Sequence, residues 1–280
     1  MSDEGSLLAD VDRLIQRVVH TFGEPVADAL APIAASGSRH RARMILSLAA
    51  GGDRPAAVQG AAAVELLHLG TLVHDDIVDQ SSRRRHAPTV HVVLGMPVAL
   101  WTADGVYAEA LHLADAVSPA GGLALGGALR RIADSQVLEA LGVTTARYWD
   151  VVDGKTVSLF DASFALADEA VGGALPAGVR DAVRAYGRLF QYVDDLHDIG
   201  GEADAMGKPT GLDADNELQT LPAADLVVSV DEVRARLQAL ATPVRDAVAA
   251  SRWEDYFGDV TDRLLEAATR VLDAAAPAPR

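Results

Sequence analysis

The chain has 280 residues, of which half are apolar, 40 are acidic and 24 are basic, so its formal net charge is −16. A chain of this length and apolar content can bury one substantial core, and we expect a single domain over residues 1–280. It contains no cysteine, which excludes disulfides, thiolate-bound metals and thiol nucleophiles. The acidic balance argues against a nucleic-acid partner, because nucleic-acid phosphates attract Lys and Arg.

The ends and the apolar segments also bear on location. No basic-plus-apolar leader stands at the N-terminus, and no uninterrupted apolar run reaches the length of about 18 residues that crosses a bilayer. We therefore expect a soluble, cytoplasmic protein without a transmembrane segment.

Helical periodicity and a high content of Ala and Leu dominate the chain, and alternation of β-branched residues is rare. In chain order, amphipathic helices are predicted at 6–21, 24–35, 39–51, 54–80, 97–116, 119–141, 144–168, 176–199, 229–248 and 255–275. Glycine and proline separate these segments, as at Gly51 and Pro119. The pattern predicts an all-α fold.

One long stretch, about residues 200–224, lacks this periodicity and is rich in Gly, Asp and Pro. Long irregular segments in compact domains are commonly functional loops. Because this stretch directly follows an acidic cluster, we expect it to form a lid.

Two copies of an acidic signature close two of the predicted helices. They consist of Asp75, Asp76 and Asp79 in the first copy and Asp194, Asp195 and Asp198 in the second. Residues i and i+4 lie one turn apart on one helix face, so the carboxylates within each signature converge. Clustered carboxylates beside apolar residues repel one another, and a cation relieves this repulsion. We expect a hard multivalent ion shared by both signatures, on two helices that face each other across a bundle.

The lysines are a second unusual feature. Of the 24 basic residues only Lys155 and Lys208 are lysines, and each directly follows a glycine. An ammonium is a compact charge, whereas a guanidinium is a planar fork. We therefore expect these two positions to require a compact cation.

The motifs around these residues resemble those of the trans-isoprenyl diphosphate synthases, also called polyprenyl synthetases. The matching elements are, in order, Glu65–His74 before the first signature, Gln80–Thr89 after it, Lys155-Thr156, Phe190–Val193 before the second signature and Gly207–Asp213 after it. The resemblance covers about residues 37–222. It implies a single-domain antiparallel helical bundle of the isoprenoid synthase type around a central cavity, and a homodimer.

The resemblance also implies a reaction and a cofactor. An allylic diphosphate loses pyrophosphate, the resulting cation condenses with isopentenyl diphosphate, and elimination gives a trans-polyprenyl diphosphate. Magnesium prefers carboxylates together with phosphate oxygens, and three ions are implied. Their implied ligands are Asp75, Asp76, Asp79, Asp194 and Asp198. For Asp76 and Asp195 the choice between a direct ligand and a neighbour of the ligands stays open.

The same resemblance assigns roles to the other site residues. The implied clamp on the allylic diphosphate is Arg84, Lys155 and Lys208, which place positive charge where the leaving group becomes negative. The implied ligands of isopentenyl diphosphate are Arg39, Arg41, His68 and Arg85. The implied catalytic set is Asp75, Asp79, Asp194, Lys155, Thr156 and Gln191. Within it, the dipoles of Thr156 and Gln191 would stabilise the cation.

Two positions depart from the family pattern. Ser38 replaces a lysine, and Leu218-Gln219 stands before Thr220-Leu221-Pro222 where a lysine is usual. Both changes remove positive charge from phosphate sites, so the acceptor site is either weaker or suited to another nucleophile. The alternative function is therefore a class I terpene cyclase, or a prenyltransferase with a non-standard acceptor.

A di-iron protein and a noncatalytic subunit are two further hypotheses. Glu65 and His68 have the Glu-x-x-His spacing of carboxylate-bridged di-iron bundles, but no second copy of that motif accompanies them. The intact carboxylates of both signatures argue against a noncatalytic subunit, because a purely structural role would not need them.

Product length is predicted from the residues one turn before the first signature. Gly70 and Thr71 precede Asp75 by five and four residues, where the resemblance places the growing tail. Both are small, so they permit a tail longer than C10. Tyr107 and His112, in the predicted helix 97–116, are candidates for the floor of this space. We predict a C15 to C20 product.

Overall fold

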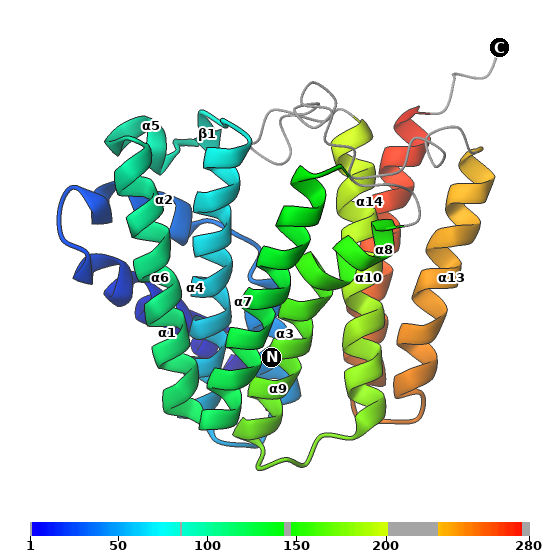
Figure 1. Cartoon of the computed structure of the whole chain (residues 1–280). Coiled ribbons are helices and arrows are strands. Elements are labelled where there is room, and N and C mark those ends of the chain that lie inside the picture. The colour runs from blue at the N-terminus through cyan, green and yellow to red at the C-terminus, as the bar shows by residue number, and fades with distance from the viewer. Residues whose placement is uncertain (1, 85, 143–146, 201–228, 276–280) are drawn as a thin grey trace. The chain divides into compact units, whose positions relative to one another are not determined.

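The computed structural model of the chain describes residues 2–84, 86–142, 147–200 and 229–275, of which residues 2, 3, 198–200, 274 and 275 are described by their backbone alone (Figure 1). The described residues form helices apart from one antiparallel pairing of two short strands, β1 (Arg83–Arg84) and β2 (Ala87–Pro88). The predicted all-α class is confirmed.

The chain divides into two compact units, which are described separately. The first unit contains Met1–Leu129 and Ala162–Ala174. The second contains Arg130–Asp161 and the described chain from Leu175 onward. The expectation of one domain over the whole chain stays a prediction.

The first unit is built around one long apolar helix. Its elements are α1 (Ser2–Thr21), α2 (Val26–Ala35), α3 (His40–Leu48), α4 (Arg54–Val78), α5 (Val90–Leu94), α6 (Met96–Val117), the beginning of α7 (Pro119–Ala140) and most of α9 (Ser158–Ala170). Asp53 caps α4 by accepting a hydrogen bond from the backbone nitrogen of Ala56 over 3.1 Å. From there α4 buries an almost unbroken Ala, Val and Leu surface and makes its most extensive contact with α6 (Figure 1).

The burial of α4 explains its composition. It is the one helix among the described residues that is long and apolar enough to cross a membrane, but 78% of its apolar window is buried inside the structure. A core helix of a folded protein has the same length and composition as a membrane span. The apolarity of α4 is therefore accounted for by packing.

The second unit is built around α10. Its elements are the end of α7, α8 (Tyr148–Val152), a π-helical turn η2 (Asp153–Val157), the start of α9 (Ser158–Ala170), α10 (Ala177–Gly200), α13 (Val230–Val248) and α14 (Glu254–Ala275). α10 packs against both α13 and α14 (Figure 1). Ser229 and Glu232 form a reciprocal capping box that begins α13.

The predicted helices agree with the observed ones, with one difference: within the predicted helix 144–168, of which residues 144–146 lie outside the described residues, α8 and α9 are joined without a break by the π-helical turn η2. At this turn η2 lies close to α7. A Cβ at Gly154 would lie 1.8 Å from the Ser135 hydroxyl oxygen and 3.1 Å from the Arg131 carbonyl oxygen. The short α5 and the β1–β2 pairing were not predicted.

Candidate functional site

The first aspartate signature lies at the C-terminal end of α4. Asp75 and Asp79 are partly exposed, and the backbone nitrogen of Asp79 closes the helix by donating to the Asp75 carbonyl over 2.8 Å. A helix C-terminus carries partial negative charge, which disfavours carboxylates. Two carboxylates at this end therefore form a locally unfavourable arrangement that a cation would stabilise.

Asp76, the middle member, is directed into the protein. It is 1% exposed, and its Oδ1 accepts a hydrogen bond of 2.6 Å from Nε of Arg84, which is itself buried. Arg84 comes from β1, so this ion pair ties the strand pairing back onto the end of α4. The predicted roles of Asp76 as a metal ligand and of Arg84 as a diphosphate ligand stay predictions, and the structure shows the two side chains bound to each other.

The space beside Gly70 is filled by Tyr107 from α6. A Cβ at Gly70 would lie 2.5 Å from Cε1 of Tyr107, so the ring packs directly on the glycine. The Tyr107 hydroxyl lies 3.3 Å from Nδ1 of His74, and the two rings meet edge-on at 5.3 Å. Burial, followed by the charges of Asp75 and Asp104, raises the pKa of Tyr107, so this hydroxyl stays protonated. The small residue at position 70 therefore accommodates an aromatic ring.

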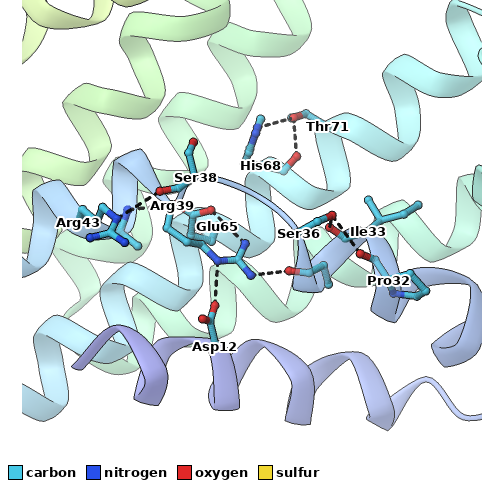
Figure 2. Close-up of polar contacts among 12 residues, drawn as sticks. Asp12, Pro32, Ile33, Ser36, Ser38, Arg39, Arg43, Glu65, His68 and Thr71 are labelled. Atoms are coloured by element: carbon cyan, nitrogen blue, oxygen red, sulfur yellow. Dashed lines mark hydrogen bonds and ion pairs between the residues drawn. The ribbon is translucent and has the colours of Figure 1, made fainter. Parts of the chain in front are cut away.

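The Arg39 guanidinium is bound by other groups of the first unit. Its Nε donates to Oδ1 of Asp12 over 2.8 Å, one terminal nitrogen lies 3.5 Å from Glu65, and the other donates to the Ala34 carbonyl (Figure 2). Glu65 also accepts from the backbone nitrogen of Ala42 over 3.0 Å. Arg39 thus joins α1, the end of α2 and the start of α3 to α4, and its role as a phosphate ligand stays a prediction.

Two other residues predicted for isopentenyl diphosphate, Arg41 and His68, are less deeply buried than Arg39. Arg41 and His68 are both partly exposed, and Nδ1 of His68 lies 3.5 Å from the Thr71 hydroxyl (Figure 2). The Glu65 carboxylate, engaged by Arg39 and a backbone nitrogen, is 5% exposed. This engagement argues against the di-iron hypothesis, which needs that carboxylate as a ligand.

The second signature lies at the C-terminal end of α10, in the second unit. Asp194 is partly exposed, whereas Asp195 is 2% exposed. Burial raises the pKa of Asp195 to about 7, against the opposing effect of hydrogen bonds from Tyr148 and Gln191. The side chain of Asp198 lies outside the described residues.

The π-helical turn carries the predicted Lys155-Thr156 pair. Nζ of Lys155 lies 2.9 Å from Oε2 of Glu139 on α7, and the Thr156 hydroxyl donates to the amide oxygen of Gln191. Asp153, at the start of the turn, accepts a hydrogen bond of 2.7 Å from Nε of Arg188 on α10. Turns of this kind are rare and concentrate at functional sites. Glu139 was missed by sequence reasoning, because no local pattern identifies the partner of a lysine.

Two groups of predictions stay predictions: the convergence of the two signatures and the roles of residues outside the described ranges. The two signatures belong to different units, so their convergence stays a prediction. Arg85, Lys208, Leu218 and nearly all of the expected lid at 200–224 lie outside the described residues. Among the residues that are described, no group of three or more acidic or histidine side chains is placed to hold a metal by itself. Each signature offers one or two carboxylates, as magnesium sites completed by phosphate oxygens and water require.

The polyprenyl synthetase family matches residues 24–252, which is most of this chain. The chain belongs to this family. Its structural relatives include the polyprenyl synthase from Caulobacter crescentus CB15, solved in complex with calcium and isoprenyl diphosphate. That structure is 29% identical, covers 98% of this chain and 90% of its own, and superposes with a TM-score of 0.73. The predicted isoprenoid-synthase type of bundle is thereby confirmed.

Curated polyprenyl synthetases give a similar picture. A (2E,6E)-farnesyl diphosphate synthase of Mycobacterium tuberculosis (H37Rv) is 37% identical over 208 residues, which are 68% of this chain and 56% of that protein. A geranylgeranyl diphosphate synthase of the same strain is 32% identical over 266 residues, which are 83% of this chain and 74% of that protein. This chain therefore spans little more than half of the first of these relatives.

Proposed function

We propose that this protein is a magnesium-dependent prenyltransferase that condenses an allylic diphosphate with isopentenyl diphosphate to give a trans-polyprenyl diphosphate. The observation that carries the proposal is the pair of partly exposed carboxylates, Asp75 and Asp79, at the C-terminal end of an apolar helix in a polyprenyl synthetase. The second signature and the Lys155-Thr156 turn supply the other parts that the chemistry needs.

The donor set fits magnesium. Asp75, Asp79 and Asp194 present carboxylate oxygens at helix C-termini, and the chain has no cysteine that would favour a softer metal. We propose three ions, with Asp198 as a further ligand. When bound, magnesium neutralises the charge of the departing pyrophosphate.

Protein side chains do the remaining work. Lys155, Arg84 and Lys208 would bind the leaving pyrophosphate. Before substrate binds, the Lys155 ammonium is held by Glu139 of α7, whose Oε2 lies 2.9 Å from Nζ. Loss of pyrophosphate leaves an allylic cation, which the dipoles of Thr156 and Gln191 would stabilise. The double bond of isopentenyl diphosphate attacks this cation, and a proton then leaves to the released pyrophosphate.

The acceptor diphosphate needs its own cations. We propose Arg41, His68, Arg85 and Arg39 for this site, with Arg39 contributing only if it exchanges some of its internal bonds for phosphate. Ser38 is exposed and supplies no charge. The site is therefore expected to bind isopentenyl diphosphate more weakly than a site with lysine at this position.

Product analysis tests the proposal. The protein is incubated with magnesium, labelled isopentenyl diphosphate and each of the C5, C10 and C15 allylic diphosphates, and a longer trans-prenyl diphosphate is the expected product. Asp75→Ala and Asp194→Ala should abolish turnover with helical circular dichroism intact, whereas Asp134→Ala, in an exposed pair with Arg130, should not change it. Retained turnover in the first two variants would contradict the metal mechanism.

The same assay distinguishes the alternative function. A terpene cyclase needs no second substrate, so it would convert a preformed C15 or C20 diphosphate alone into a cyclic hydrocarbon. A prenyltransferase with another acceptor would consume the allylic diphosphate without incorporating labelled isopentenyl diphosphate.

We propose a C15 to C20 product, as predicted from Gly70 and Thr71. Relatives named as farnesyl and geranylgeranyl diphosphate synthases support this range. Tyr107, packed on Gly70, is the side chain we propose as the floor on this face of α4.

We also propose that the protein is a cytoplasmic homodimer. Apolar side chains remain exposed on α5 and the first half of α6: Val92, Val93, Met96, Val98, Leu100 and Trp101. Trp101 is 74% exposed, and exposed apolar patches mark interaction surfaces. Light scattering should show a dimer that Trp101→Glu converts to a monomer, while Leu123→Glu, at another exposed site, leaves it intact. A monomeric wild-type protein would contradict this proposal.

A further inference from the structure

A chain of side-chain hydrogen bonds links α8, η2 and α10 within the second unit. The Tyr148 hydroxyl donates to Oδ2 of Asp195 over 2.7 Å, and the Gln191 amide nitrogen donates to Oδ1 of Asp195 over 2.7 Å. The Thr156 hydroxyl in turn donates to the Gln191 amide oxygen. Tyr148, Thr156 and Asp195 are 3%, 4% and 2% exposed and Gln191 is partly exposed, so water has limited access to these bonds.

These hydrogen bonds select one orientation of the Gln191 amide. A carboxyl oxygen that faces the amide accepts from its nitrogen, which leaves the amide oxygen directed at Thr156. Rotating the amide by half a turn would set its oxygen against Oδ1 of the ionised Asp195 carboxylate with no proton between them. Two acceptors that face each other without a proton, one of them on the buried Asp195, are costly, so Asp195 determines which end of Gln191 meets Thr156.

Tyr148 determines the position of the Asp195 carboxyl group. Its hydroxyl binds the second carboxyl oxygen, so both oxygens are held, one by each neighbour. The Tyr148 ring is contacted edge-on by Trp149 at 4.8 Å, and Trp149 is stacked on Tyr192 at 6.5 Å. Packed rings, rather than a flexible side chain, thus fix the hydroxyl.

We propose that Tyr148 and Asp195 are positioning residues that orient Gln191 and Thr156 toward the carbocation. This inference rests on the proposed function, in which the dipoles of Gln191 and Thr156 stabilise that cation. Tyr148 and Asp195 act through Gln191 and touch neither substrate. Because charged groups elsewhere bind the two diphosphates, a misoriented amide slows ionisation and leaves substrate binding unchanged.

Tyr148→Phe is the primary test, because it removes the hydroxyl and keeps the ring. The wild-type protein is assayed first with magnesium, an allylic diphosphate and isopentenyl diphosphate. Absence of condensation at this step would overturn the proposed function, whereas the variants test only the present inference. We expect kcat of Tyr148→Phe to fall about tenfold, with KM for both diphosphates within about twofold of wild type. Tyr186→Phe, a buried tyrosine on α10 whose ring meets Phe160 at 5.5 Å, is the matched control with unchanged kcat.

A double-mutant cycle separates positioning from a merely structural role. In the Gln191→Leu background, Tyr148→Phe should lower kcat less than about twofold, because its effect passes through Gln191. Asp195→Asn keeps an oxygen for the Gln191 amide and an NH₂ group for the Tyr148 oxygen, so its kcat should stay within about threefold of wild type.

Three results would overturn the inference. They are an unchanged kcat in Tyr148→Phe, an undiminished effect of that substitution in the Gln191→Leu background, and a large loss of kcat in Asp195→Asn. The last result would identify Asp195 as a required charge instead of an acceptor that orients Gln191.

Discussion

Replacing Tyr107 by alanine should lengthen the product. The Tyr107 ring covers Gly70, five residues before Asp75, and five residues of helix correspond to about 7.5 Å along the axis of α4. A tail that starts from a diphosphate near Asp75 and runs along this face therefore meets the ring. The substitution removes seven non-hydrogen atoms, and an isoprene unit has five carbons, so the new space accommodates about one more unit. Loss of the ring should also lower the free energy of unfolding by about 2 kcal/mol, since Tyr107 is only partly exposed.

The assay is chromatographic separation of the labelled products after dephosphorylation, with product ratios compared at equal turnover. Tyr107→Phe is the control, because it keeps the ring but loses the hydroxyl that lies 3.3 Å from His74, and its product length should equal that of wild type. Gly70→Ala should shorten the product, since the added methyl would force the ring away from α4 into the tail space. An unchanged product length in Tyr107→Ala would refute the assignment of this ring as the floor.

Two further predictions concern stability. Burial alone raises the pKa of Asp161, but the hydrogen bond and charge of Arg180 outweigh it and hold that pKa below 3.8. The ion pair therefore stabilises the fold fully at pH values above the ordinary aspartate pKa of 3.8, and its contribution is lost as the pH falls through the lowered pKa of Asp161. Arg180→Met should lower the free energy of unfolding at pH 7 by only about 1 kcal/mol, measured by urea unfolding, because the Arg180 side chain is half exposed. If the difference in unfolding free energy between variant and wild type grew in acid, this reasoning would be contradicted. Gly154→Ala should cost about 1–3 kcal/mol because its Cβ would overlap the Ser135 hydroxyl. Gly126→Ala is the control, because its Cβ would meet only Leu111 at 3.7 Å. If the two variants were equally stable, overlap with Ser135 would be excluded as a cause of destabilisation in Gly154→Ala.

Much of the fold was readable from the sequence because helix formation is governed by short-range pattern. The period of the apolar residues placed α4 and α10, and the i, i+4 spacing placed each aspartate pair on one helix face. The pattern did not predict the π-helical turn η2 within residues 144–168. The approach of Gly154 to α7 accompanies a π-helical turn, and no local signal marks which helix packs against a glycine.

In the candidate site, too, sequence pattern predicts the type of side chain, whereas packing decides its partner. From the family resemblance, Arg39, Arg84 and Lys155 were predicted to bind diphosphate. The structure pairs them with Glu65 and Asp12, with Asp76, and with Glu139. A long charged side chain can reach several carboxylates, and the one it reaches depends on which elements pack together. Asp76 and Asp195 are likewise buried, whereas Asp75, Asp79 and Asp194 are partly exposed, which spacing alone does not predict.

From the sequence alone the family and the helical class were predicted and are confirmed, and the carboxylates for a hard cation and the Lys-Thr pair between them were predicted, since all of these depend on residue identity and on spacing along a helix. Only the tertiary structure decided that a tyrosine from α6 fills the space beside Gly70, and that Tyr148 and Asp195 hold Gln191. Both depend on contacts between residues far apart in the sequence, Gly70 with Tyr107 and Tyr148 with Asp195, which form only when the helices pack.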